Sequence, residues 1–204
     1  MNTTLDLDAL SADLRRCAQT LSPAKFAHVV CLTGRLDAMR QWYQAVLNAR
    51  IAFGNEQLCF LSYDDEHHRI GLIRSDAATA APAADSAIVH HFAFTYRDLG
   101  ELFGNYLRLK QQGIVPFWCI NHGPTTSMYY KDPDGHRVEL QVDNFSNEEC
   151  DAFFASGAYD ENPIGINFDA DEWIGRYLRG EDAKALTRRP PLPAGTSPFQ
   201  MIRD

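Results

Sequence analysis

The chain repeats one succession of short elements, and this duplication limits the fold more than any other feature of the sequence. Regions 25–74 and 88–145 each predict a strand, an amphipathic helix and three further strands. The last strands read HRIGL from His68 and HRVEL from His136, so they share a histidine, an arginine, a β-branched residue and a leucine. Two small sheets, each with one covered face, bury more apolar surface by packing together than either does alone.

Apolar side chains recur at helical spacing in each region. They are Leu36, Met39, Tyr43, Val46 and Leu47 in the first, and Leu99, Leu102, Phe103, Tyr106 and Leu107 in the second. Residues 75–87 carry a proline but no large apolar side chain, as linkers do. We therefore predict an α+β fold in which paired β-α-β-β-β modules (25–74 and 88–145) close into a half-open barrel, forming one domain over 25–145.

Two segments flank this domain. Residues 1–24 place leucines at near-helical spacing before Ser22-Pro23, which predicts an added N-terminal helix. Residues 146–204 mix short helical patterns with proline-rich coil, and we expect this C-terminal extension to wrap the barrel or a partner subunit, with Trp173 as its packing anchor.

Composition excludes several classes of protein. The 19 basic and 27 acidic residues give a net charge of −8, which argues against nucleic acid as a partner. No apolar run is long enough for a membrane helix, and the N-terminus has acids where a secretory signal has bases, so we expect a cytoplasmic protein. The five cysteines never form a C-x-x-C pair, so reduced thiols are expected rather than disulfides or structural zinc.

Metal-ligand residues occupy duplicated positions. His28 and His91 open the first strands of the two modules, and Glu139 and Gly71 hold equivalent places on the last strands. If a pseudo-twofold axis relates the modules, the four positions lie around one point. They then supply two imidazoles and one carboxylate, and the quadrant at Gly71 has no ligand. This set is typical of non-haem Fe(II) oxygenases and also accepts Mn(II), whereas structural zinc favours four ligands and thiolates. We predict a metal site of His28, His91 and Glu139.

Two neighbouring histidine pairs leave alternatives open. His90 and His91 point to opposite faces of a strand, and the spacing to the following helix favours His91 as the ligand. At the other pair, strict alternation would place His67, not His68, on the face of Gly71.

Four stretches resemble a known family over about residues 26–144: AHVVCLT, HHRIGLI, HHFAFTYRDL and NHGPTTSMYYKDPDGHRVELQVDNF. They are similar to the vicinal oxygen chelate (glyoxalase/bleomycin resistance/dioxygenase) superfamily, and within it to type I extradiol ring-cleavage dioxygenases. The resemblance implies that His28, His91 and Glu139 bind Fe(II). It also implies acid/base catalysis by His68, a hydrogen bond from Tyr129 to a substrate or iron-bound oxygen, and an outer-sphere role for His122.

The resemblance predicts a dioxygenase that cleaves the ring of a catechol-like 1,2-dihydroxyaromatic with O2, assembled as a homo-oligomer. Two alternatives stay open. One is a metal-dependent isomerase or lyase with water or substrate in the Gly71 quadrant. The other is a non-catalytic protein that binds aromatics or antibiotics, against which the complete set of metal ligands counts.

Overall fold

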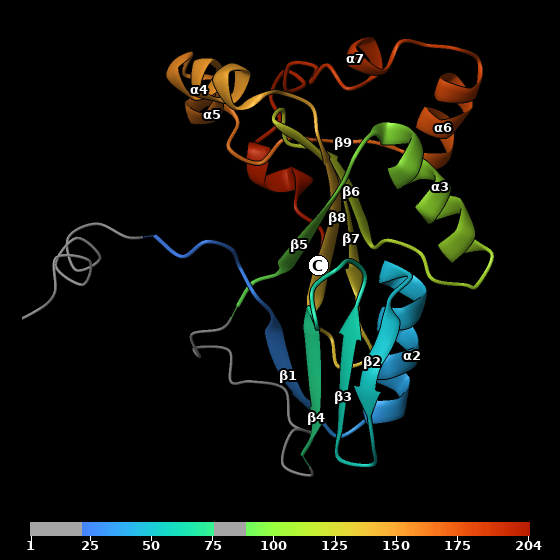
Figure 1. Cartoon of the computed structure of the whole chain (residues 1–204). Helices are drawn as coiled ribbons and strands as arrows, with labels where there is room; N and C mark the ends of the chain where they lie inside the picture. The colour runs from blue at the N-terminus through green and yellow to red at the C-terminus, as the bar shows by residue number, and fades with distance from the viewer. Residues whose placement is uncertain (1–21, 76–88) are drawn as a thin grey trace, which may run out of the picture.

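The computed structural model describes residues 22–75 and 89–204, which form two mixed β-sheets with several helices (Figure 1). The helix expected over 1–24 and the linker expected over 75–87 fall outside the described residues, apart from 22–24 and 75.

The first sheet has the strand order β1-β4-β3-β2. Its strands are β1 (Val29–Thr33), β2 (Arg50–Gly54), β3 (Leu58–Ser62) and β4 (Ile70–Arg74). Helix α2 (Leu36–Leu47) connects β1 to β2 and packs on β3 and β4 with its apolar stripe. This is the β-α-β-β-β succession expected for the first module.

The second sheet repeats that arrangement and adds one strand, in the order β5-β8-β7-β6-β9. Its strands are β5 (Phe92–Tyr96), β6 (Trp118–Asn121), β7 (Thr125–Lys131), β8 (Arg137–Asp143) and β9 (Ile166–Asn167). Helix α3 (Leu99–Lys110) follows β5, and Asp98 caps it by accepting a hydrogen bond from the Glu101 amide.

Strand register agrees between the two modules. The first and last strands are parallel in each, with Val30 opposite Gly71 and Ala93 opposite Glu139. Val30 and Ala93 each stand two residues after a histidine at the head of the strand. Gly71 and Glu139 are therefore structural counterparts, as the sequence repeat predicts.

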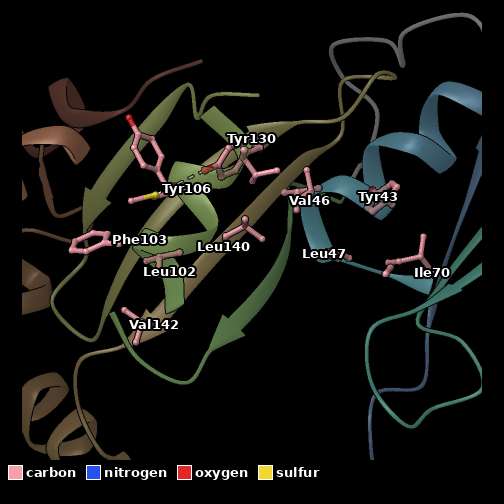
Figure 2. Packing of buried hydrophobic residues seen from close by; sticks show 14 of the residues in the cluster. Tyr43, Val46, Leu47, Ile70, Leu102, Phe103, Tyr106, Tyr130, Leu140 and Val142 are labelled. Atoms are coloured by element: carbon pink, nitrogen blue, oxygen red, sulfur yellow. Dashed lines mark hydrogen bonds between the residues drawn. The ribbon is translucent and has the colours of Figure 1, made fainter. Parts of the chain in front are cut away.

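The two modules share one hydrophobic core, to which both helices contribute (Figure 2). Polar contacts reinforce this junction: the Asn105 side chain donates to the Val46 carbonyl at 3.3 Å, and Arg35 Nε lies 2.8 Å from Asp134 Oδ1. The modules are thus joined through α2, α3 and the β7–β8 turn.

The sheets do not close into the half-open barrel expected from the sequence. Helices α2 and α3 lie on the same side of the two sheets (Figure 1). Because the modules meet through these helices, the sheet faces turned away from α2 and α3 point to the other side, next to each other rather than toward each other.

The C-terminal extension packs on the second module. It comprises α4 (Asn147–Ala155), α5 (Ala158–Glu161), β9, α6 (Ala170–Leu178), α7 (Ala183–Leu186) and the 3-10 helix η2 (Pro198–Met201). β9 lengthens the second sheet by pairing with β6, and the Trp173 ring is buried and stacks on Phe168 at 4.1 Å. Within the described ranges, no helix has the length and apolar character needed to cross a membrane.

Candidate metal and substrate site

The strand pair β5–β8 brings His91 and Glu139 together. His91 stands just before β5, and its Nε2 lies 3.0 Å from Glu139 Oε2. The Glu139 side chain is only 5% exposed, whereas that of His91 is 33% exposed. Burial raises the pKa of Glu139, but hydrogen bonds from His91 and Ser127 outweigh it and hold this pKa below its usual range. Glu139 is thus a carboxylate at neutral pH.

This spacing suits two neighbouring ligands of one metal ion. Ligand atoms that bind a metal at about 2.1 Å and at right angles lie about 3 Å apart. An imidazole and a carboxylate are also suitable donors for Fe(II). Within residues 22–75 and 89–204, no three His, Cys, Asp or Glu side chains of one chain lie close enough together to hold a metal.

Tyr129 and His122 lie beside this pair. Strand register places Tyr129 opposite Glu139, and His122 Nε2 is 3.1 Å from the Tyr129 hydroxyl and 4.0 Å from Glu139 Oε1. On its other side, His122 Nδ1 donates to the carbonyl of Ile164. With the proton on Nδ1, the neutral ring presents Nε2 as an acceptor for the Tyr129 hydroxyl.

Burial fixes the charge states of these two groups. It raises the pKa of Tyr129 well above its ordinary value, and the Glu139 charge acts in the same direction. It lowers the pKa of His122, a shift that the hydrogen bond to Ile164 only partly opposes. Tyr129 therefore keeps its proton, and His122 is neutral at neutral pH.

His28 and His68 lie together in the first module. Their rings stack at 4.4 Å, and the other side of His68 stacks on Phe60, also at 4.4 Å. His28 is exposed just before β1. Thus each module presents part of the predicted site: His28 and His68 on the first sheet, and His91, Glu139, Tyr129 and His122 on the second.

An aromatic ring occupies the quadrant at Gly71. Phe60 is the counterpart of Tyr129, because it lies opposite Gly71 as Tyr129 lies opposite Glu139. A Cβ atom at Gly71 would lie 3.1 Å from Val30 Cγ2 and 3.6 Å from the Phe60 ring. Phe60 was not among the residues predicted for the site, although the sequence repeat also relates β3 to β7.

The two histidine alternatives have different surroundings in the structure. His90 is exposed, with Nε2 2.6 Å from Arg137 Nη1, whereas His91 contacts Glu139. His67 is 68% exposed beside Glu66, whereas His68 lies between two rings.

Arg189 of the extension fixes the loop that carries His122. Its guanidinium donates to the carbonyls of His122 at 3.0 Å, Asn162 at 2.9 Å and Ala158 at 3.0 Å. Its charge also lies 4.9 Å from the centre of the Phe153 ring. No motif in the sequence signals this role, because it depends on contacts between residues far apart in the chain.

A cavity of about 470 Å³ lies between the edges of the two sheets. Phe26, Val29, Tyr63 and Arg69 line it from the first module, and residues 91–94 line it from the second. Its volume and its apolar walls suit a small aromatic molecule next to His91.

Comparisons with known proteins agree on a family. Residues 25–140 match the family model described as the Glyoxalase/Bleomycin resistance protein/Dioxygenase superfamily. Biphenyl-2,3-diol 1,2-dioxygenase 2 of Rhodococcus globerulus is 47% identical over 146 residues, covering 71% of this chain and 77% of that protein. Biphenyl-2,3-diol 1,2-dioxygenase 3 of the same organism is 39% identical over 172 residues, covering 83% and 90%.

Among solved structures, lactoylglutathione lyase from Agrobacterium tumefaciens is similar with a TM-score of 0.48 and 20% identity, covering 59% of this chain and 94% of that one.

Proposed function

The chain belongs to the glyoxalase/bleomycin resistance/dioxygenase superfamily, and on that premise we propose that it is an extradiol dioxygenase, which opens the ring of a catechol-like 1,2-dihydroxyaromatic with O2. The observation that carries the proposal is the His91–Glu139 pair, backed by Tyr129 and His122 in one hydrogen-bonded cluster. The two curated relatives, both named as dioxygenases for biphenyl-2,3-diol, support the same substrate class.

Fe(II) is the metal we propose, with His28, His91 and Glu139 as its ligands; the same donors also accept Mn(II). When bound, Fe(II) supplies neighbouring coordination positions for the diol oxygens and O2 and lets electron density pass between them. The carboxylate of Glu139 offsets part of the charge of such an ion.

The remaining residues bind the substrate and move protons. Tyr129 keeps its proton and donates a hydrogen bond to a diol oxygen of the bound substrate. When no substrate is bound, the Tyr129 hydroxyl donates to His122 Nε2 instead. His68 accepts a proton from a diol hydroxyl and gives it back as the ring opens. Phe26 and Phe94, on the cavity walls, provide apolar contacts for the aromatic ring.

Oxygen consumption by the metal-loaded protein tests the proposal. The protein is loaded with Fe(II) without oxygen and then assayed in an oxygen electrode with 2,3-dihydroxybiphenyl and with catechol. We expect one O2 consumed per diol and a yellow ring-opened product. Bound metal without oxygen uptake would favour an isomerase or lyase, and a chain that binds no metal would be an aromatic-binding protein.

Two neighbouring variants test the proton-transfer role. His68→Ala is expected to lower kcat by about 10²-fold or more with the iron content unchanged, as loss of a general acid/base does. His67→Ala is the matched control: this neighbour is 68% exposed and its Nδ1 contacts His68 Nδ1 at 2.6 Å, but it lies outside the stack of His28, His68 and Phe60, so its loss should keep normal turnover. Equal kcat values in the two variants would exclude His68 from proton transfer.

A further inference from the structure

We infer that the cleft between α4, α5 and the chain after α7 binds a small organic carboxylate with a flat, conjugated body. The cleft has a volume of about 570 Å³ and lies at the end of the second module that points away from the first (Figure 1). Clefts of this size bind small molecules. The site is separate from the cavity next to His91, because different residues line the two.

Arg189 is a partly buried cation in this cleft. The three carbonyls that its guanidinium contacts supply partial charges but no full negative charge. In residues 22–75 and 89–204, the arginines that form ion pairs are other ones. Burial lowers the pKa of Arg189, and the opposing effects of Tyr159 and Glu161 are smaller. An anion in the cleft would supply the counter-ion that the described part of the chain does not.

Arg189 also keeps hydrogen-bond donors free. A guanidinium has five N–H groups. Its Nη1 donates to the carbonyls of His122 and Asn162, and its Nη2 donates to that of Ala158. The Nε–H group and one N–H of Nη2 therefore have no acceptor among the described residues. A carboxylate, with its two acceptor oxygens, can accept from both donors.

Lys184 of α7 lines the same cleft and adds a second cation. The one carboxylate in the lining is that of Glu149, which accepts from the Ser146 amide at 2.7 Å and so serves to cap α4. Lys184 and Arg189 thus outweigh Glu149, although the chain as a whole carries a net charge of −8. A local excess of positive charge favours a negatively charged ligand.

The remaining walls of the cleft are largely apolar. The Phe145 and Phe153 rings lie 5.5 Å apart, and Pro190 and Pro191 complete this part of the lining. Such walls favour an anion with a flat conjugated body over a hydrated inorganic ion, because the body buries apolar surface against the rings. The ligand class is therefore a conjugated carboxylate.

The cleft adjoins the loop that carries His122. Arg189 contacts the His122 carbonyl, and a Cβ atom at Gly123 would lie 2.7 Å from Phe153 Cζ. The proposed ring cleavage breaks the bond beside one hydroxyl-bearing carbon and adds both atoms of O2. That carbon becomes a carboxylate, with release of a proton, and its former neighbour becomes a carbonyl group. The product thus belongs to the class that the cleft suits, a link that alone rests on the proposed function.

Calorimetric titration of the full chain without added metal tests the ligand class. Benzoate and sorbate, a linear dienoate, should each bind at one site per chain, about 10-fold more tightly than benzyl alcohol or inorganic phosphate. Tighter binding of sorbate would point to ring-opened acids, and tighter binding of benzoate to aromatic acids. Phosphate or benzyl alcohol binding as tightly as the two carboxylates would overturn the inference, as would no binding of either carboxylate.

Two lysine variants test where the carboxylate binds. Lys184→Met keeps the length of the side chain but removes its charge, and should weaken benzoate binding about 3- to 10-fold. Lys131→Met is the matched control, because Lys131 is an exposed lysine of β7 that contacts the Phe117 ring outside the cleft. Circular dichroism checks that both variants fold. Equal affinities in the two variants would overturn the inference.

Nuclear magnetic resonance reads Arg189 itself. Its Nε–H signal is the arginine signal that disappears in Arg189→Met, and benzoate should shift this signal with the affinity found by calorimetry. Benzoate bound only in the cavity next to His91 would leave the signal unchanged and overturn the inference. These measurements need neither metal nor turnover, so their failure leaves the proposed function standing. A chain that binds benzoate in this way but consumes no O2 would remove the proposed function and not the site.

Discussion

The Tyr43 hydroxyl of helix α2 donates a hydrogen bond to the buried carboxylate of Asp132, 3.1 Å away in the β7–β8 turn. Asp132 also accepts from the amides of Asp134 and His136 within that turn. One carboxylate thus organises the turn of the second module and ties it to the helix of the first.

Removal of this hydroxyl should weaken the junction between the modules. Tyr43→Phe is expected to lower the free energy of unfolding by about 1–3 kcal/mol, since a buried charged acceptor loses a donor. Urea denaturation measures the change. Tyr130→Phe is the control, because the hydroxyl of this equally buried tyrosine contacts the weak acceptor Met128 Sδ at 4.0 Å. Equal losses in the two variants would mean that the Asp132 contact adds nothing specific.

Stability should depend on pH through His136. Its Nδ1 lies 2.9 Å from Asp132 Oδ2, and this hydrogen bond raises the pKa of His136 above the ordinary 6.5. The folded state therefore binds the proton more tightly than the unfolded chain. The stabilisation is complete below pH 6.5 and disappears as the pH rises through the raised pKa.

Denaturation from pH 5.5 to 8.5 measures this dependence, over a range set by the ordinary histidine pKa of about 6.5. The difference in unfolding free energy between the wild type and His136→Gln should shrink as the pH rises, because only the wild type loses the charged contact with Asp132. The effect is modest, since the His136 side chain is 39% exposed. If the difference in unfolding free energy between the two proteins stays constant over this pH range, His136 does not cause the pH dependence of stability.

Arg189 should affect turnover through the position of His122. Arg189→Met leaves the carbonyls of His122, Asn162 and Ala158 without their donor, which should cost about 2–4 kcal/mol of stability. We also expect kcat to fall several-fold while the iron content stays at the wild-type level, because the proposed ligands are untouched. Arg188→Met, the exposed neighbour, is the control and should change neither quantity. A parallel loss of iron and kcat would instead indicate general unfolding.

The backbone at Gly165 should tolerate no side chain. Its φ is +121°, and a Cβ atom there would lie 2.4 Å from the Asn121 carbonyl oxygen. Gly165→Ala is expected to cost at least about 3 kcal/mol and to shift the Ile164 carbonyl that holds His122. Gly195→Ala, at φ +76° with open space around it, should cost only about 1 kcal/mol. Thermal unfolding of the two variants compares them, and similar losses would contradict the steric argument.

The element order of both modules was predictable from the sequence because local patterns determine it. The apolar stripes of α2 from Leu36 to Leu47 and of α3 from Leu99 to Tyr106 are signals within a few residues. The equivalence of Gly71 and Glu139 followed from the repeat and agrees with the strand register.

Local sequence patterns could not predict whether the two sheets close into a barrel or what the C-terminal extension contacts. How the sheets face each other depends on the packing between α2 and α3, whose apolar stripes are the same in open and closed arrangements. The contact of Arg189 with the His122 loop joins residues 67 positions apart and leaves no periodic signal. Adjacent histidines such as His90 and His91 were ambiguous because alternation is weakest where a strand begins.

The dependence of His122 on the extension also sets an order of events during synthesis of the protein. The His91–Glu139 pair is complete once the second module has emerged from the ribosome, whereas the His122 ring and its loop are fixed by Ile164 and Arg189. A nascent chain that ends before residue 189 can thus present the carboxylate and imidazole but not an oriented His122 ring. The proposed site therefore depends on a segment that is synthesised after both modules.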